Sequence, residues 1–433
     1  MNQAHFNTGL LAFLDQSPTP FHAAENLTTA LQTAGFVRLD ERATWQLRPG
    51  GRYWITRNGS SVIAFALGSK PLAESGLRLV GAHTDSPCLK LKPHPELLAH
   101  GYQQLAAEVY GGVLLNPWFD RDLSLAGRVT LRLSDGTLCN RLLDFRAPLA
   151  VIPSLAIHLD REANDKRSIN KQTYLPALIC GKTPEAFALN LELVRHLAAQ
   201  EPALATAQIQ AFELSFYDTQ PARLVGWHAE FIASARLDNL LSCYTGLCAL
   251  CDAESDFARL LVCNDHEEVG SGSTSGARGN FLESVLLRLL GDHETAARTL
   301  ANSLLISTDN AHAVHHNFAD KHDVRHGPLI NAGPALKTNA NQSYATNSES
   351  AAVFRQAAAL AGVPVQSFIA RADMGCGSTI GPLAATRLGL RTVDVGVPTF
   401  AMHSIRELAG ALDAHALYLA LKCFFALPRV VVD

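Results

Sequence analysis

The spacing of apolar and polar positions predicts an α/β chain interrupted by a segment of different texture. Apolar residues recur at helical spacing over 2–15 and 19–34, so two amphipathic helices are expected at the N-terminus. Further along, strand patterns alternate with helix patterns, and this alternation favours a mixed, largely parallel sheet with helices on both faces. The expected strands are 53–57, 61–67, 77–83, 259–263, 303–308, 364–370 and 391–396, and the expected later helices are 239–252, 281–301, 348–361 and 408–426.

Residues 93–235 carry short strand runs and turn signals such as Asp135-Gly136, but few long helical patterns. We therefore expect a β-rich domain over 93–235, inserted into an α/β domain that is formed by 1–92 and 236–433.

Composition narrows the class of protein. The chain has 433 residues, of which 48% are hydrophobic, so it can bury a large core. A net charge of −4 argues against nucleic acid or an anionic membrane as the main partner. The N-terminus lacks the pattern of a signal peptide, and no apolar stretch approaches the length of a membrane span. Nine scattered cysteines indicate reduced thiols in a cytoplasmic protein, and the Cys248-x-x-Cys251 pair reads as core thiols on a helix.

Polar clusters follow four of the expected strands, and a fifth cluster begins a helix. Singly, such clusters are usually loop residues, helix caps or solvated pairs. Together they are informative, because the carboxyl ends of parallel strands meet in one crevice. The clusters are His83-Thr84-Asp85, Glu267-Glu268, Asp309-Asn310-Ala311-His312 and Met402-His403-Ser404 after strands, and Asp238-Asn239 at the helix start.

These clusters offer histidines and carboxylates without cysteine, a set that suits zinc, manganese or cobalt. There are enough carboxylates for two metals that share one bridging aspartate. Of the adjacent pair Glu267-Glu268, one would be held ionised by a metal and the other would be free to act as a base. Asp85, two residues beyond His83, can orient the imidazole of a metal ligand. This arrangement predicts metal-assisted hydrolysis of an amide.

The motifs that carry these clusters resemble the aspartyl aminopeptidase family of dinuclear zinc exopeptidases. The resemblance covers essentially the whole chain and rests on the order and combination of its motifs. They are GAHTDSPCLKLKP, ARLDNLLSCYTGL, NDHEEVGSGSTSGA, STDNAHAVHHNF, QSYATNS, ADMGCGSTIGP and MHSIRE.

The resemblance implies two zinc ions per subunit, with cobalt or manganese as substitutes. It makes Glu267 the general base, Asp85 the group that orients His83, and the Asp238–Asn239 peptide bond cis. It assigns the ligands as His83, Asp238 and Asp309 for one metal, and Asp238, Glu268 and His403 for the other.

The resemblance also implies a preference for N-terminal Asp or Glu, with Lys337 and His312 supplying positive charge to the pocket. His158 resembles a histidine that reaches the active site of a neighbouring subunit. The inserted domain would serve as a lid or dimerisation domain, and the chain would assemble from dimers into a dodecamer.

Two alternatives stay open from the residues. The chain could be another hydrolase of the same architecture, such as a broad-specificity aminopeptidase, a carboxypeptidase or a deacylase. It could also be a metal-depleted assembly or binding protein that keeps the fold without turnover.

Overall fold

The computed structural model describes residues 1–181 and 187–432, and the chain groups into two compact units. The first unit comprises 1–85, 222–402 and 407–433, and the second comprises 86–221 and 403–406. These bounds differ from the expected 93–235, because the strand from Cys88 pairs within the second unit and Phe231–Ser234 pairs within the first.

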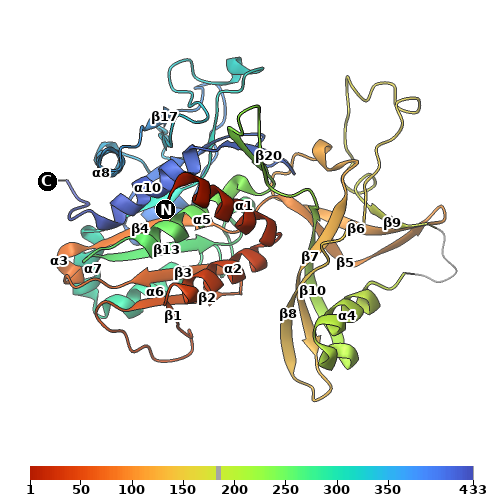
Figure 1. Ribbon diagram of the computed structural model, residues 1–433, viewed down its shortest axis with the longest axis horizontal. Helices are drawn as coiled ribbons and strands as arrows, with labels where there is room; N and C mark the ends of the chain where they lie inside the picture. The colour runs from red at the N-terminus through yellow and green to blue at the C-terminus, as the bar shows by residue number, and fades with distance from the viewer. Residues whose placement is uncertain (182–186, 433) are drawn as a thin grey trace. The chain divides into compact units, whose positions relative to one another are not determined.

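A nine-stranded mixed sheet forms the centre of the first unit (Figure 1). Its three central neighbours, β13, β4 and β14, run parallel to one another. Their residues are almost all buried, as expected for strands covered on both faces. In spatial order the strands are β1 (Val37–Arg38), β2 (Arg52–Arg57), β3 (Ser61–Ala66), β13 (Ala258–Asn264), β4 (Leu77–His83), β14 (Leu304–Thr308), β18 (Arg391–Gly396), β16 (Ala335–Lys337) and β17 (Gln366–Phe368).

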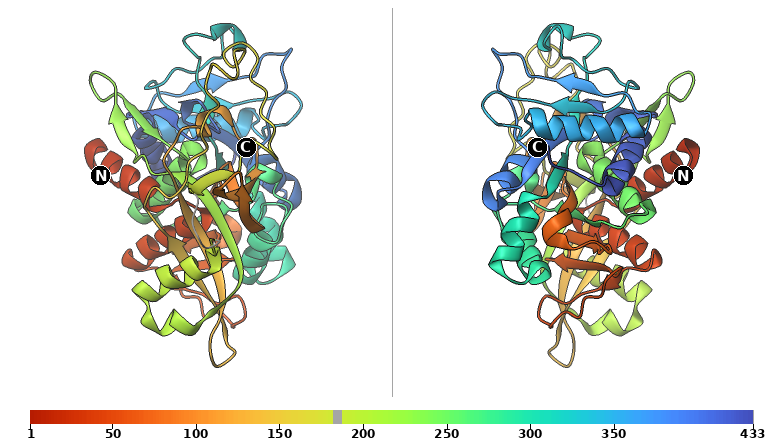
Figure 2. Two further views of the ribbon diagram at one scale, coloured as in Figure 1. Left: turned by 90° about the vertical axis from the view of Figure 1, so that its right-hand side faces the viewer. Right: turned by 90° about the vertical axis from the view of Figure 1, so that its left-hand side faces the viewer.

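Helices cover both faces of this sheet, and the N-terminal pair lies opposite α6 and α7 (Figure 2). Separate apolar cores form on the two faces. One core contains residues of α1 (Gln3–Gln16), α2 (Pro20–Thr33), α5 (Leu237–Asp252), α8 (Ser348–Leu360) and α10 (Asp413–Ala426), and the other packs α3 (Leu72–Ser75), α6 (Phe281–Leu290), α7 (His293–Ala301) and α9 (Ile380–Leu388).

Two expected helices are wrong in extent. The single helix expected over 281–301 is broken, because Gly291 has φ 80° and Asp292 caps a new helix by accepting from the Thr295 N–H. The helix expected from 408 begins at Asp413, since Glu407–Gly410 is a strand. That strand belongs to a small sheet ordered β11 (Arg223–Val225), β12 (Phe231–Ser234), β20 (Glu407–Gly410), β19 (Pro398–Phe400) and β15 (Ala311–His312).

The second unit is built on an antiparallel sheet of six strands with its own apolar core. The helix α4 (Leu189–Gln200) contributes buried leucines to this core. In spatial order the strands are β8 (Leu138–Asp144), β7 (Leu123–Arg132), β10 (Gln208–Asp218), β5 (Cys88–Ala99), β6 (Tyr102–Tyr110) and β9 (Ala177–Cys180).

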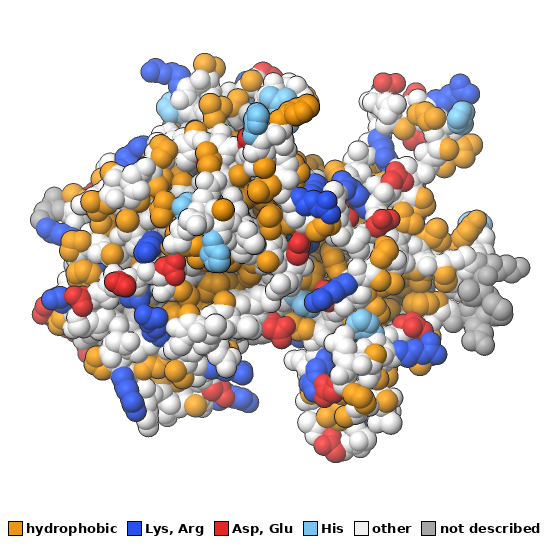
Figure 3. Space-filling model, viewed as in Figure 1, with side chains coloured by type: hydrophobic (Ala, Val, Ile, Leu, Met, Phe, Trp, Pro, Cys, Tyr) orange, Lys and Arg blue, Asp and Glu red, His pale blue; other side chains and the backbone are white. Residues whose placement is uncertain are grey.

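Among the described residues, no helix is long and apolar enough to cross a membrane. Acidic and basic side chains are interspersed over the face shown in Figure 3. All nine cysteines are free thiols, and Cys248 and Cys251 lie on α5 as expected.

Candidate metal centre

Three neighbouring strand ends bring the predicted ligands together. His83 is the last residue of β4, Asp309 follows β14, and Glu267 and Glu268 follow β13 in a short 3-10 turn, η3 (Glu267–Val269). Because these strands are parallel and adjacent, the side chains emerge at one edge of the sheet. The structure therefore brings these residues together at the carboxyl ends of three neighbouring strands.

His83 lies at the middle of a group of carboxylates. Its Nε2 is 3.3 Å from Asp238 Oδ1 and 3.7 Å from Asp309 Oδ1. Ligand atoms of His83, Asp238 and Glu268 all lie within 4.8 Å of one another, close enough to hold one metal ion. One imidazole and several carboxylates form a donor set that fits zinc, so these residues fit the predicted metal.

Asp85 connects His83 to the loop that carries Glu267 and Glu268. Its Oδ1 lies 3.4 Å from His83 Nδ1, and the same nitrogen is 3.0 Å from the Asp85 carbonyl oxygen. The two carboxylate oxygens also accept the backbone N–H groups of Glu267 and Glu268, each at 3.1 Å. Asp85 therefore fixes both the imidazole and the position of the glutamate pair.

Asp238 is placed by a carboxylate that sequence reasoning missed. The backbone N–H of Asp238 donates to Glu407 Oε2 at 2.8 Å, and Glu407 is buried on β20. The Asp238–Asn239 bond is cis, as the resemblance implied. Asn239 donates from Nδ2 to the Thr308 carbonyl and so ties the start of α5 to the end of β14. Glu407 lies in the MHSIRE motif, but nothing local in that motif indicates a partner 169 positions away.

Burial and neighbouring charges shift the pKa values of Glu267 and His83. Burial raises the pKa of Glu267 to about 7, and the nearby carboxylates add to this while His83 opposes it. Burial by itself would lower the pKa of His83, but Asp238 and the other carboxylates raise it well above the ordinary value. Bound cations would lower the pKa values of Glu267 and His83 again, because a cation supplies the positive charge that a proton supplies in the metal-free site.

Lys337 lies at the metal centre rather than at the surface. Its ammonium is within 3.0 Å of the Asp309 carbonyl oxygen, 3.3 Å of Asp309 Oδ2 and 3.1 Å of the Asn310 carbonyl oxygen. It also lies 4.8 Å above the ring of Tyr344. These three acceptors match the three donors of an ammonium group, so Lys337 holds Asp309 in place.

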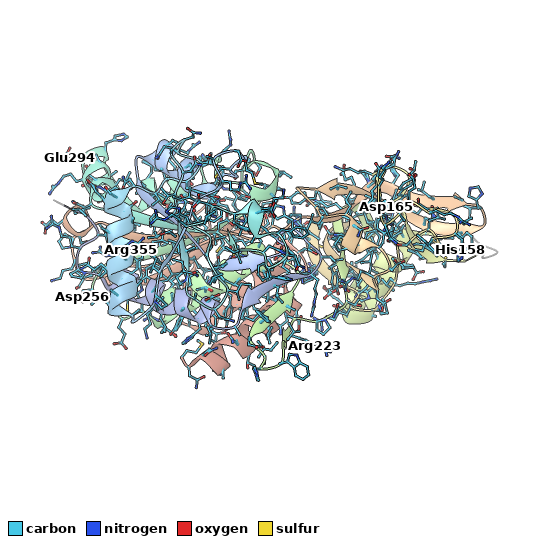
Figure 4. All side chains as sticks on the ribbon, turned by 90° about the horizontal axis from the view of Figure 1, so that it is seen from above. His158, Asp165, Arg223, Asp256, Glu294 and Arg355 are labelled. Atoms are coloured by element: carbon cyan, nitrogen blue, oxygen red, sulfur yellow. The ribbon has the colours of Figure 1, made fainter. Side chains whose placement is uncertain are left out.

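The other predicted residues occupy separate places. His312 lies on β15, three residues after Asp309, and it lines a cavity of about 280 Å³. Loss of solvation, followed by the charge of Lys337, lowers its pKa. His403 groups with the second unit, where its Nδ1 is 3.0 Å from the Gly112 carbonyl oxygen. His158 is exposed on the second unit (Figure 4).

Comparison with known proteins gives a consistent assignment. Residues 13–425 match the family described as "Aminopeptidase I zinc metalloprotease (M18)". The chain is 58% identical over 420 residues to the "Probable M18 family aminopeptidase 2" of Stutzerimonas stutzeri (strain A1501), a match that covers 97% of this chain and 98% of the relative. The protein of the same name from Pseudomonas fluorescens (strain Pf0-1) is 56% identical over 420 residues, covering 97% of this chain and 98% of that relative.

Solved structures share the fold over nearly the whole chain. A chain in the cryo-EM structure of the Ape4 and Nbr1 complex has 38% identity and a TM-score of 0.93, covering 98% of this chain and 86% of that chain. The crystal structure of prApe1 has 29% identity and a TM-score of 0.91, and the match covers 98% of this chain and 94% of that chain. A chain of the S. cerevesiae mApe1 dodecamer has 28% identity and a TM-score of 0.83, and the match covers 96% of this chain and 95% of that chain. The chain therefore belongs to the M18 family of zinc metallo-aminopeptidases.

Proposed function

We propose that this enzyme removes acidic residues, Asp or Glu, from the N-termini of peptides and holds two zinc ions per chain. The observation that carries the proposal is the group of His83, Asp238, Asp309 and Glu268 with Glu267 beside it at one edge of the sheet. Such a group provides ligands and a separate base, which are the two requirements of metal-assisted hydrolysis.

The ligand assignment follows the resemblance. His83, Asp238 and Asp309 would hold one zinc, and Asp238, Glu268 and His403 the other, with Asp238 shared. When bound, zinc would polarise the scissile carbonyl and lower the pKa of a water molecule, and cobalt or manganese could do the same.

Proton transfer falls to Glu267, which is not a ligand in this assignment. Its carboxylate takes the proton of the attacking water and gives it to the leaving amine. Asp85 supports this role, because it holds the backbone N–H groups of both glutamates. Lys337 supports the proposed ligand Asp309, because its ammonium lies 3.3 Å from Asp309 Oδ2.

The acidic preference needs positive charge close to the metal centre. Lys337 is buried there, and His312 follows the ligand Asp309 by three positions. We assign both to the pocket for the N-terminal side chain. His158 would enter the site of a neighbouring subunit, with 93–235 serving as the lid or dimerisation domain.

Assembly and location belong to the same proposal. We infer a homododecamer built from dimers, and mApe1, which shares this fold, is described as a dodecamer. The nine free thiols are compatible with the reducing cytoplasm.

A panel of N-terminal aminoacyl anilides (Asp, Glu, Leu, Ala and Lys), with and without chelator, tests the proposal. Chelator-sensitive cleavage confined to Asp and Glu, restored by zinc, is the expected result. Cleavage of Leu or Ala instead would keep the metal chemistry and refute the acidic pocket. No cleavage under any metal would refute the proposed aminopeptidase specificity and favour a deacylase or a binding protein.

A further inference from the structure

A second polar cavity lies in the first unit at the opposite end of the central strands. It has a volume of about 380 Å³, and its walls are formed by Pro49, Gly50, Arg52, Arg259 and the segments 66–69 and 253–256. Arg259 stands near the amino end of β13, whereas the metal centre follows the carboxyl end of the same strand. At a rise of about 3.3 Å per residue, the five steps from Arg259 to Asn264 already span roughly 17 Å.

Two arginines converge on this cavity from the sheet. Arg52 on β2 and Arg259 on β13 both pair with Ala66 of the intervening strand β3. Directly paired residues point to the same face, so the two guanidinium groups flank a single methyl side chain. Burial, and after it the charge of Arg52, lowers the pKa of Arg259, which agrees with two like charges being close.

Arg78 is a second buried arginine, and its guanidinium group has a full set of hydrogen-bond acceptors. Its five hydrogen bonds, all to backbone carbonyls, have lengths from 2.6 to 3.2 Å. Arg259 is also buried, with 4% of its surface exposed, but it makes only two hydrogen bonds to the described residues. These reach the carbonyl oxygens of Leu250 at 3.4 Å and Ser255 at 3.5 Å. Arg259 is therefore charged and buried with most of its donors unused.

The nearby carboxylates do not neutralise the pair. Across the described parts of the chain, neither Arg52 nor Arg259 forms an ion pair. Asp256 lies at the outer edge of the first unit (Figure 4), and its carboxylate accepts from Ser69 Oγ at 3.0 Å. Glu254 is exposed to solvent.

A purely structural role is the competing explanation. Arg259 reaches a carbonyl near the end of α5, and Arg52 Nη1 reaches Ala34 at the end of α2, so each could complement a helix C-terminus. However, the Arg52 hydrogen bond to Ala34 is 3.5 Å long, and the described residues provide no second hydrogen bond to that side chain, whose guanidinium carbon lies 5.8 Å from the centre of the Phe36 ring. These long hydrogen bonds leave other N–H donors of the two arginines available to a ligand in the cavity that both side chains line.

The geometry points to a binding site for a small oxyanion, a phosphate or carboxylate group, held between Arg52 and Arg259 and distant from the metal centre. Planar guanidinium groups bind such anions with paired, charge-assisted hydrogen bonds. A buried cation of this kind is costly unless a counter-ion accompanies it. The site would sense an anionic small molecule and stabilise the first unit when filled.

Calorimetric titration of the holoenzyme with inorganic phosphate tests the site, with the metal centre first saturated by an amino-acid hydroxamate. Acetate and sulfate at equal ionic strength distinguish carboxylate, phosphate-like and non-specific salt effects. We expect saturable phosphate binding that weakens by about tenfold or more in Arg52→Gln, since each lost charge-assisted pair of bonds is substantial. Arg259→Gln should behave in the same way if it folds.

Arg42→Gln is the matched control, because Arg42 is an exposed arginine paired with Asp40 and should leave phosphate binding unchanged. Thermal unfolding gives the second readout. Phosphate should raise the Tm of the wild type and of Arg42→Gln, but not that of Arg52→Gln. Absence of saturable binding by any of the three anions would overturn the proposal. So would equal phosphate binding in the wild type and Arg52→Gln, which would leave the arginines with a helix-capping role alone.

Discussion

Replacing Lys337 by Met distinguishes two roles of this lysine. Its ammonium holds the carboxylate and carbonyl of Asp309, and we also assign it to the acidic pocket. Methionine keeps much of the length of the side chain while removing the charge and all three donors. The substitution should therefore impair metal binding as well as substrate preference.

The expected loss in zinc affinity follows from the burial of the Lys337–Asp309 ion pair. The Lys337 side chain is 3% exposed and that of Asp309 is 13% exposed, so solvent screens their interaction little. Removing one partner of a buried ion pair costs about 3–5 kcal/mol, because the other charge is left uncompensated. A bound zinc would compensate Asp309 in part. We therefore expect the loss in zinc affinity to be about 10–100-fold, the usual effect of removing a group that orients a ligand.

Zinc titration into chelator-stripped protein, followed by hydrolysis of Asp and Ala anilides, measures both effects. Lys337→Met should need more zinc for half-maximal activity, and at saturating zinc it should cleave the Asp substrate less well relative to Ala. Tyr344→Phe keeps the aromatic ring beside Lys337 and serves as the control. A Lys337→Met enzyme with wild-type zinc affinity would refute the positioning role. An unchanged Asp to Ala ratio would refute the pocket role.

Three further predictions concern the metal centre. Glu267→Gln should retain both metals by elemental analysis yet lose about 10²–10⁴-fold in kcat, because proton transfer is lost while the ligands stay. If the metals also leave, Glu267 and Glu268 have exchanged roles. Asp238→Ala should bind neither metal firmly, and a variant that keeps two would disprove the bridge. Carboxylates raise the pKa of metal-free His83 well above its ordinary value, so zinc must displace a proton there. Apparent zinc affinity, measured by competition with a chelator, should therefore fall by about tenfold per pH unit as the pH drops below that pKa.

The site could be predicted from sequence where the signal is local. A histidine or carboxylate directly after an apolar run marks the end of a buried strand, and parallel strands bring such ends together. His83, Glu268 and Asp309 satisfy this rule on β4, β13 and β14, which are neighbours in the sheet. The order of these strands is not encoded locally, but any order that keeps them adjacent gives the same crevice.

Element boundaries were predicted less well, for a physical reason. Apolar residues at 408–411 fit a helix as well as a strand by periodicity, and the outcome depends on pairing with β12 and β19. The break at Gly291 has a local cause, since a glycine with positive φ followed by a capping aspartate ends one helix and begins the next.

Asp85 illustrates what the spacing of residues cannot reveal. Its position two residues beyond His83 correctly suggests contact with the imidazole, because that interaction is local. The same carboxylate also holds the backbone of Glu267 and Glu268, which lie 182 and 183 positions away. Lys337 and Glu407 act in the same way, each contacting a proposed ligand, Asp309 or Asp238, from another strand. The proposed ligands are therefore recognisable from sequence by their residue type and by their position after a strand. The groups that hold them are ordinary charged residues whose function arises when the chain folds, so substitutions at Asp85, Lys337 or Glu407 should affect metal binding although none of the three is a ligand.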